Sequence, residues 1–159
     1  MISTALAERL RDAGLVWTPI AGDAFQLAGT DFEGDVFTVS DMTIEAHHYP
    51  TGTILGFNGT TEWALDSVAL DDALWLPRED QLRDLLRGTF RRLDREVGAD
   101  GRVAYRVTVA IEGAREGDSS IAAESTSADF TSDDPAEAYG LALLALIRRS
   151  ASGEAAAGG

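Results

Sequence analysis

Residues Ile44 to Trp63 read IEAHHYPTGTILGFNGTTEW, with apolar and polar side chains alternating on either side of a turn sequence. Alternation with a period of two residues is typical of a β-strand that buries one face. The turn YPTG, from Tyr49 to Gly52, and the dipeptide Asn58-Gly59 both favour tight reversals of the chain. The stretch therefore predicts successive hairpins of an antiparallel sheet.

The same period of two appears on both sides of this stretch. It extends back to Val16, and it is clearest from Val103 to Ile111 (VAYRVTVAI), where bulky apolar residues alternate with small or polar ones. We expect the pairing partner of this strand in the segment SSIAAESTS, from Ser119 to Ser127, because only a short loop separates the two.

Two longer segments change to the helical period. The segment from Arg78 to Val97 follows Pro77 and carries its apolar residues three and four positions apart, which predicts the main helix. The segment from Asp134 to Arg149 starts with an aspartate cap and Pro135, and its apolar residues are spread over almost the whole circumference of the predicted helix. Such a helix should be deeply covered, either by the rest of the domain or by a partner.

A short N-terminal helix completes the predicted fold, with Ser3 or Thr4 as its cap and Gly14 at its end. The whole pattern predicts an α+β fold: a meandering antiparallel sheet of about five to seven strands, with the two main helices packed on one face. We expect a single domain over residues 1–150 and a disordered tail over 151–159.

Composition excludes several chemistries. The 159-residue chain carries a formal net charge of -14, all its basic residues are arginines, and it contains no cysteine. Without lysine there is no Schiff base and no lysine-bearing phosphate loop, and without cysteine there is no disulfide or thiolate site. The acidic field disfavours nucleic acid and anionic membranes, and we expect a cytoplasmic protein because no signal peptide or membrane span is visible.

The two histidines, His47 and His48, raise the question of a metal or acid/base site. Adjacent residues of a strand point to opposite faces, so the two rings should not converge on one ion. The alternative hypothesis is a metal-assisted hydrolase that uses either histidine with Glu45 and with the carboxylates of Asp31, Glu33 and Asp35. The segment that contains those three carboxylates departs from a calcium-binding loop at Val36 and Met42, where glycine and glutamate are required.

The predicted main helix also carries four arginines at four-residue spacing: Arg83, Arg87, Arg91 and Arg95. They would form a basic ridge on an acidic protein. One interpretation is a solvated face that pairs with Glu79 and Asp84 along the same helix. The other is a site for an anionic ligand, a nucleic acid or a protein partner.

Aromatic residues supply the remaining candidates. Trp17, Trp63 and Trp75 stand at the edges of predicted elements, where an indole can anchor the core. The last two flank an acidic linker that could form the rim of a binding surface, and Tyr139 belongs to the apolar final helix. We therefore predict a non-enzymatic acidic binding or adaptor module that binds a protein partner or itself, with no catalytic residue, metal or cofactor.

The stretch SDMTIEAHHYPTGTILGFNGTTEWALDSVALDDALWLPREDQLRDLL, from Ser40 to Leu86, resembles a set of short acidic actinobacterial proteins that carry a pilus-assembly label. The resemblance is looser around Ala5 and in the segment DPAEAYGLALLALI. It implies a bacterial, cytoplasmic setting and a link to pilus or secretion assembly, and it brings no catalytic residues.

Overall fold

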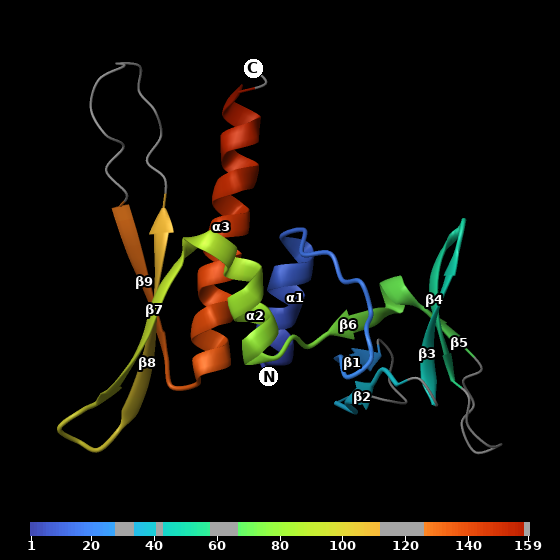
Figure 1. Cartoon of the computed structure of the whole chain (residues 1–159), viewed down its shortest axis with the longest axis horizontal. Coiled ribbons are helices and arrows are strands. Elements are labelled where there is room, and N and C mark those ends of the chain that lie inside the picture. The colour runs from blue at the N-terminus through green and yellow to red at the C-terminus, as the bar shows by residue number, and fades with distance from the viewer. Residues whose placement is uncertain (28–33, 41–42, 58–66, 112–125, 158–159) are drawn as a thin grey trace. The chain divides into compact units, whose positions relative to one another are not determined.

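The computed structural model describes residues 1–27, 34–40, 43–57, 67–111 and 126–157. Within these ranges the chain forms three α-helices and nine strands, and the strands make three small antiparallel sheets of three strands each (Figure 1). The α+β class is confirmed. The prediction of one meandering sheet is wrong, because the strands are divided among separate sheets.

The chain divides into two compact units. One comprises Ser3–Arg78, and the other comprises Glu79–Gly159 together with Met1–Ile2. The predicted limits of a single domain over 1–150 and of a tail from Ala151 stay predictions, although the last helix continues to Ala157.

The unit Ser3–Arg78 contains one helix and two of the sheets, with strand orders β2-β1-β6 and β3-β4-β5. A buried cluster that includes Phe25, Phe37, Ile44 and Leu55 joins strands of both sheets, so they share a core. Its elements are α1 (Thr4–Asp12), β1 (Ala24–Leu27), β2 (Phe37–Thr38), β3 (Ile44–Tyr49), β4 (Gly52–Phe57), β5 (Ser67–Ala69), the 3₁₀ turn η2 (Leu70–Asp72) and β6 (Ala73–Trp75).

The hairpin predicted around YPTG is confirmed. Strands β3 and β4 pair from Ile44↔Phe57 to Tyr49↔Gly52, so Pro50 and Thr51 occupy the turn. Gly52 has φ +142°, a conformation that side chains disfavour, which explains why glycine suits this position. The second predicted turn, at Asn58-Gly59, lies outside the described residues.

The second unit packs two helices beside the sheet β7-β8-β9. In Figure 1, α3 lies along this sheet, which it contacts through β8 and β9, and α2 packs on α3. Val107 and Val109 of β8 are fully buried, as are Ala138 and Ala142 of α3. Its elements are α2 (Glu79–Leu86), the 3₁₀ turn η3 (Arg87–Thr89), β7 (Phe90–Val97), β8 (Val103–Ile111), β9 (Thr126–Ser132) and α3 (Pro135–Ala157).

The prediction of one long helix over Arg78–Val97 is wrong. The helix α2 ends at Leu86, and the Thr89 hydroxyl donates to the Leu86 carbonyl at 2.6 Å across the turn that follows. Arg87 has φ +49° and Gly88 follows it, so the chain leaves the helical path there. From Phe90 onward the same residues form β7, which pairs along its length with β8 and contains an irregularity between Phe90 and Arg92.

The predicted strand Val103–Ile111 is confirmed as β8, and the described end of its predicted partner pairs with it, Thr126 with Ile111 and Ser127 with Ala110. The described partners of β8 are β7 and β9, and β9 begins at Thr126. The remainder of the predicted partner segment Ser119–Ser127 lies outside the described residues, so its pairing stays a prediction. The apolar alternation of β8 places Val107 opposite Leu93 on one side and Phe130 on the other, so one face of this sheet is apolar.

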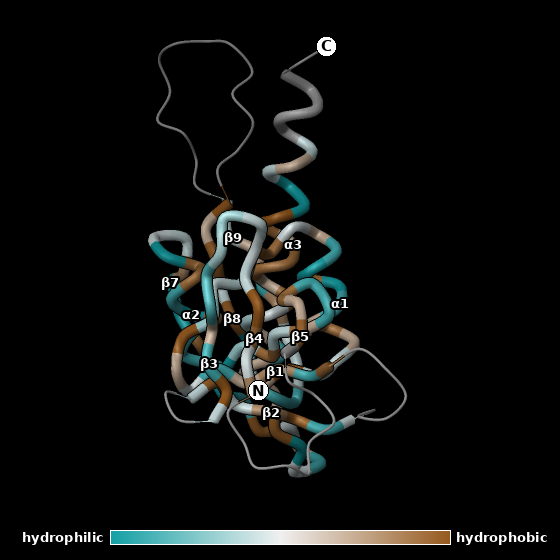
Figure 2. The backbone as a smooth tube through the Cα atoms, turned by 90° about the vertical axis from the view of Figure 1, so that its right-hand side faces the viewer, coloured by the Kyte–Doolittle hydropathy of each residue, from teal (hydrophilic) through white to brown (hydrophobic). Residues whose placement is uncertain are grey.

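The cap of the final helix is confirmed. The Glu137 N–H donates to the Asp134 side chain at 3.1 Å, and α3 starts at Pro135. The apolar colour in Figure 2 is concentrated in the part of α3 near the sheet, and the side chains from Arg148 to Ser152 are exposed. Within the described part of the chain, none of the helices is both long enough and apolar enough to span a membrane.

Candidate functional site

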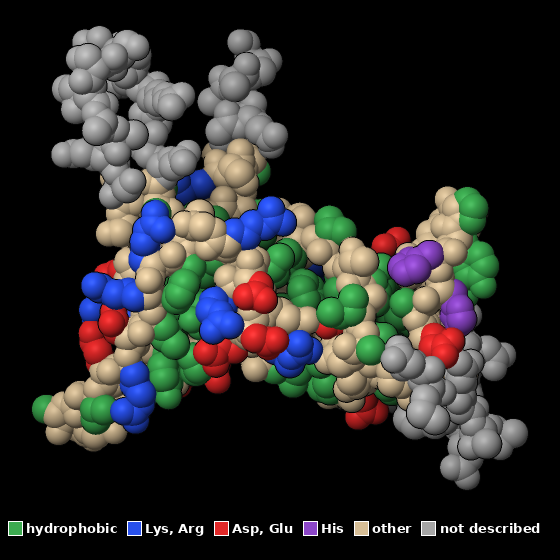
Figure 3. All heavy atoms as spheres, in the orientation of Figure 1, with side chains coloured by type: hydrophobic (Ala, Val, Ile, Leu, Met, Phe, Trp, Pro, Cys, Tyr) green, Lys and Arg blue, Asp and Glu red, His purple; other side chains and the backbone are tan. Residues whose placement is uncertain are grey.

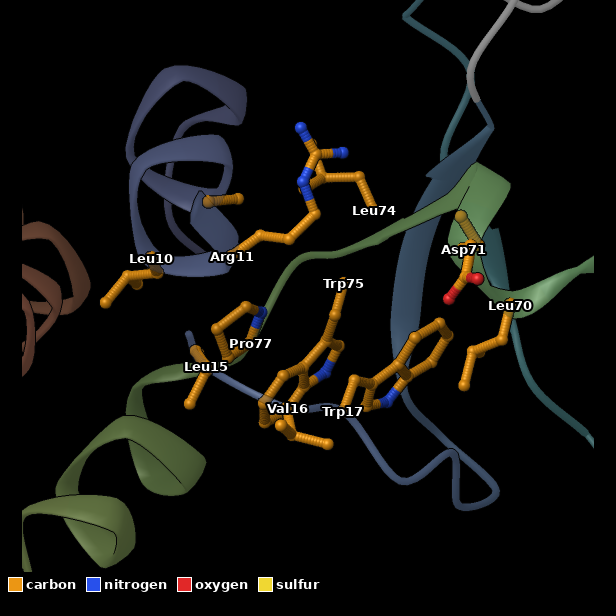
Figure 4. A pocket seen from close by; sticks show the side chains of 12 residues that line it. Leu10, Arg11, Leu15, Val16, Trp17, Leu70, Asp71, Leu74, Trp75 and Pro77 are labelled. Atoms are coloured by element: carbon orange, nitrogen blue, oxygen red, sulfur yellow. The ribbon is translucent and has the colours of Figure 1, made fainter. Parts of the chain in front are cut away.

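A cavity of about 380 Å³ lies within the unit Ser3–Arg78 (Figure 4). We call it the tryptophan cavity. Its volume lies in the range of pockets that hold small ligands or buried side chains. Ten of its twelve lining residues are apolar, and the full set is Ala7, Leu10, Arg11, Leu15, Val16, Trp17, Leu70, Asp71, Ala73, Leu74, Trp75 and Pro77.

The helix α1 and the turn after it form one wall. The Ser3 hydroxyl accepts from the Leu6 N–H at 3.3 Å and starts the helix. At the other end Gly14 has φ +102°, its N–H donates to the Arg11 carbonyl at 2.9 Å, and the Leu15 N–H donates to the Leu10 carbonyl at 3.0 Å. These two hydrogen bonds make a Schellman motif, which reverses the chain and brings the segment Leu15–Trp17 to the cavity.

Trp17 is held by a buried carboxylate. Its indole Nε1 donates to Asp23 Oδ2 at 2.8 Å, and the Ile20 N–H donates to the same oxygen at 3.0 Å. Asp23 is only 1% exposed, and its other oxygen lies 3.8 Å from the guanidinium of Arg78. A buried carboxylate is stable only when it is paired, so Asp23 needs these partners. Its hydrogen bond to Nε1 in turn fixes the orientation of the Trp17 ring.

Trp75 supplies the second indole. It ends β6, where it pairs with Phe25 of β1, and its ring lies parallel to that of Trp17, with an interplanar angle of 5° and centroids 6.2 Å apart. Its Nε1 is buried and has no hydrogen-bond partner in the described part of the chain. An unpaired buried donor lowers the stability of the folded state by about 1–3 kcal/mol. The packing of the indole ring must offset this cost, and it is packing rather than a hydrogen bond that holds Trp75 in place.

The two charged residues of the cavity lie on opposite sides of it in Figure 4, Arg11 on α1 and Asp71 in η2. Arg11 is neutralised locally, since its Nε and Nη2 both lie 3.3 Å from the carboxylate of Asp12. Asp71 forms no ion pair with the residues that the structure describes. Beside two aromatic rings the cavity therefore presents one carboxylate, that of Asp71, which has no ion-pair partner among the described residues.

One exposed apolar side chain belongs to the cavity lining. Val16, which lines it, is 81% exposed, and Ile20 in the following loop is 59% exposed. Single exposed apolar residues are common on protein surfaces. The position of Val16 in the lining of an apolar cavity, however, makes an exposed apolar surface of the kind that protein partners use.

The histidines lie on the hairpin β3–β4 and diverge. His47 Nε2 lies 3.8 Å from Glu45 Oε2, whereas His48 Nδ1 is hydrogen-bonded to the hydroxyl of Thr53 at 3.0 Å on the other face. Figure 3 shows the two histidines as separate purple patches. The His47 ring covers Gly56, because a Cβ at that glycine would lie 2.9 Å from the ring. The prediction that the two rings point to opposite faces is confirmed.

A metal site is not formed by the described residues. Within them, no three His, Asp or Glu side chains gather closely enough to hold an ion. Of the carboxylates that the hydrolase hypothesis adds to Glu45, Asp31 and Glu33 lie outside the described residues, and Asp35 is exposed on the surface.

The basic ridge of four arginines on one helix is wrong, because only Arg83 belongs to α2. It lies 3.9 Å from Asp84. Arg87 belongs to η3, and Arg91 and Arg95 belong to β7. Arg91 donates to the Gly88 carbonyl at 2.9 Å, so the backbone of the turn binds this guanidinium.

Two aromatic candidates remain to be placed. Trp63 lies outside the described residues. Tyr139 is 2% exposed and packs against Phe90 with ring centroids 5.6 Å apart, so it is a core residue of its unit rather than a surface contact. Burial, followed by the nearby carboxylate of Glu79, raises the pKa of Tyr139 above its ordinary value of 10.0, and the positive charge of Arg83 partly offsets this.

Sequence reasoning identified Trp75 and missed the rest of the cavity. Trp17 was expected only to anchor the core, and Asp23 gave no signal, because a lone aspartate in a turn is usually exposed. Only the cluster of tryptophans near the ends of elements pointed to this region. The chain matches no protein-family model, no curated protein and no solved structure, so the candidate site rests on its own geometry.

Proposed function

We propose that the protein is a small, non-enzymatic binding or adaptor module that engages a protein partner through the tryptophan cavity. The observation that carries this proposal is an apolar cavity that continues onto the exposed side chain of Val16. Protein interfaces place aromatic anchors in such pockets and surround them with contacts that exclude water.

The lining residues support binding rather than chemistry. They include no serine, threonine, histidine or glutamate, and their only ionisable side chains are Arg11 and Asp71. A nucleophile and a general base within hydrogen-bond reach of each other are the usual signature of covalent catalysis, and this cavity lacks that pair. The binding energy of a guest would come from burial of apolar surface.

The exposed rim favours a protein over a small metabolite. A metabolite site encloses its ligand, whereas here Val16, which lines the cavity, is 81% exposed. A partner that covers Val16 would remove its apolar surface from water. The resemblance to short acidic pilus-assembly proteins leads us to propose that this partner belongs to a bacterial pilus or secretion assembly.

The test uses a substitution that leaves the core intact. Val16→Arg changes an 81% exposed side chain at the cavity, and Val97→Arg changes a 58% exposed valine in β7 as the matched control. Tagged wild-type protein and both variants would be used to capture proteins from a lysate of the source cells. Each captured protein would then be purified and titrated calorimetrically against all three chains.

We expect one partner whose affinity falls at least tenfold with Val16→Arg and stays within twofold of wild type with Val97→Arg. Circular dichroism should show that both variants fold as the wild type does. If every captured protein binds Val16→Arg as tightly as the wild type, the proposal is wrong.

A further inference from the structure

The tryptophan cavity combines two features that bear on the kind of guest it would hold. Two parallel indoles, Trp17 and Trp75, line it, and the carboxylate of Asp71 stands in its wall without a cation partner among the described residues. The indole face carries negative electrostatic potential, and so does a carboxylate. Both features attract the same kind of guest, a cation.

The rest of the chain strengthens this preference. The other charged residue of the cavity, Arg11, is neutralised by Asp12 at 3.3 Å, so it opposes a cation only weakly. Asp72, next to Asp71 in η2, adds a second exposed carboxylate at this end of the site. The net charge of -14 raises the local concentration of cationic partners before they dock.

Among cationic side chains, arginine fits these features better than lysine. Its planar guanidinium stacks on aromatic faces, forms two parallel hydrogen bonds to a carboxylate and loses less hydration than an ammonium group. From this charge complementarity, and resting on the function proposed above, we propose that the partner is a basic protein segment that inserts an arginine into the tryptophan cavity. There its guanidinium stacks on Trp17 or Trp75 and pairs with Asp71.

The test titrates the intact protein with capped glycine-rich pentapeptides that differ only in their central residue. The central residue is arginine, its neutral analogue citrulline, lysine or tryptophan. Binding would be followed through the indole N–H signals of Trp17 and Trp75 in ¹H–¹⁵N spectra, at low and at high salt. Asp71→Asn removes the carboxylate charge at constant shape, and Asp35→Asn, at an exposed position, is its matched control.

We expect the arginine peptide to shift both indole signals and to bind about tenfold more tightly than the citrulline peptide, which corresponds to the combined worth of one cation–π contact and one ion pair. Asp71→Asn should remove most of that difference and Asp35→Asn should not. Equal binding of the arginine and citrulline peptides, or strongest binding of the tryptophan peptide, would overturn the inference and indicate an apolar anchor instead.

The two proposals fail separately. If a partner depends on Val16 but binds the Asp71→Asn variant as tightly as wild type, the proposed function holds and the inference of an inserted arginine is wrong. If the cavity selects the arginine peptide but no captured partner depends on Val16, the proposed function is wrong and the cation preference of the site is retained.

Discussion

Removal of the Asp23 carboxylate should destabilise the unit that contains the tryptophan cavity. In the structure, one oxygen of Asp23 accepts from both Trp17 Nε1 at 2.8 Å and the Ile20 N–H at 3.0 Å. Asp23→Ala leaves both donors without their acceptor. A buried donor that loses its acceptor costs about 1–3 kcal/mol, and Trp17 is only half-buried, so we expect a loss of about 2–4 kcal/mol in the free energy of unfolding.

Two further variants make this prediction specific. Asp23→Asn retains an oxygen at the same place and both hydrogen bonds, so it should lose only about 1 kcal/mol, the difference between charged and neutral acceptors. The ion pair with Arg78 adds little to either loss, because its atoms are 3.8 Å apart and the arginine side chain is 42% exposed. Asp35→Ala, at an exposed position, should stay within about 0.5 kcal/mol of wild type.

The assay is urea unfolding followed by tryptophan fluorescence. All three tryptophans, Trp17, Trp63 and Trp75, lie in Ser3–Arg78, so this signal reports on the affected unit alone. An Asp23→Ala variant whose free energy of unfolding stays within about 0.5 kcal/mol of wild type, or an Asp23→Asn variant that loses as much as Asp23→Ala, would contradict this role of the carboxylate.

Three other predictions follow from particular side chains. Arg87→Gly should raise the free energy of unfolding by about 0.5–1 kcal/mol in a denaturant titration, because arginine at φ +49° is strained where glycine is not; a loss of stability would contradict this. Gly56→Ala should lose less than about 1 kcal/mol, since the new Cβ would lie 2.9 Å from the far end of the His47 ring, which is 41% exposed and can turn aside, and adding His47→Ala should recover that loss in a double-mutant cycle. The raised pKa of Tyr139 means that the folded state retains its phenolic proton longer than the unfolded state, so stability should decline as pH rises above 10.0; Tyr139→Phe should make that decline shallower in stability measurements across the alkaline range.

Local features of the molecule could be predicted from the sequence alone. Gly14 ends α1 and Asp134 caps α3, and the reversal between Tyr49 and Gly52 joins β3 to β4. In each case the atoms that interact are at most five residues apart, so the residue types in a short window carry the information. The strand β8 was equally clear, because its alternation has only one interpretation.

The segment from Phe90 to Val97 shows where local information ends. Its apolar residues satisfy helical spacing, and they also satisfy a strand with one irregularity near Arg92. The structure adopts the strand because β8, which follows after a short turn, offers a complete row of backbone partners. A choice between two compatible periods therefore depends on a neighbour outside the window.

The candidate site depended on tertiary structure to a greater degree. The sequence determined that the protein is acidic, lacks lysine and cysteine, and places tryptophans at the ends of elements. Only the fold brought Trp17 beside Trp75 and buried Asp23 between an indole and an arginine, because these contacts join residues from β6, the segment after α1 and the chain after β6. Whether a side chain is buried, and whether its charge is neutralised, depends on all the residues that pack around it in the fold. For that reason neither property can be predicted from a single stretch of sequence.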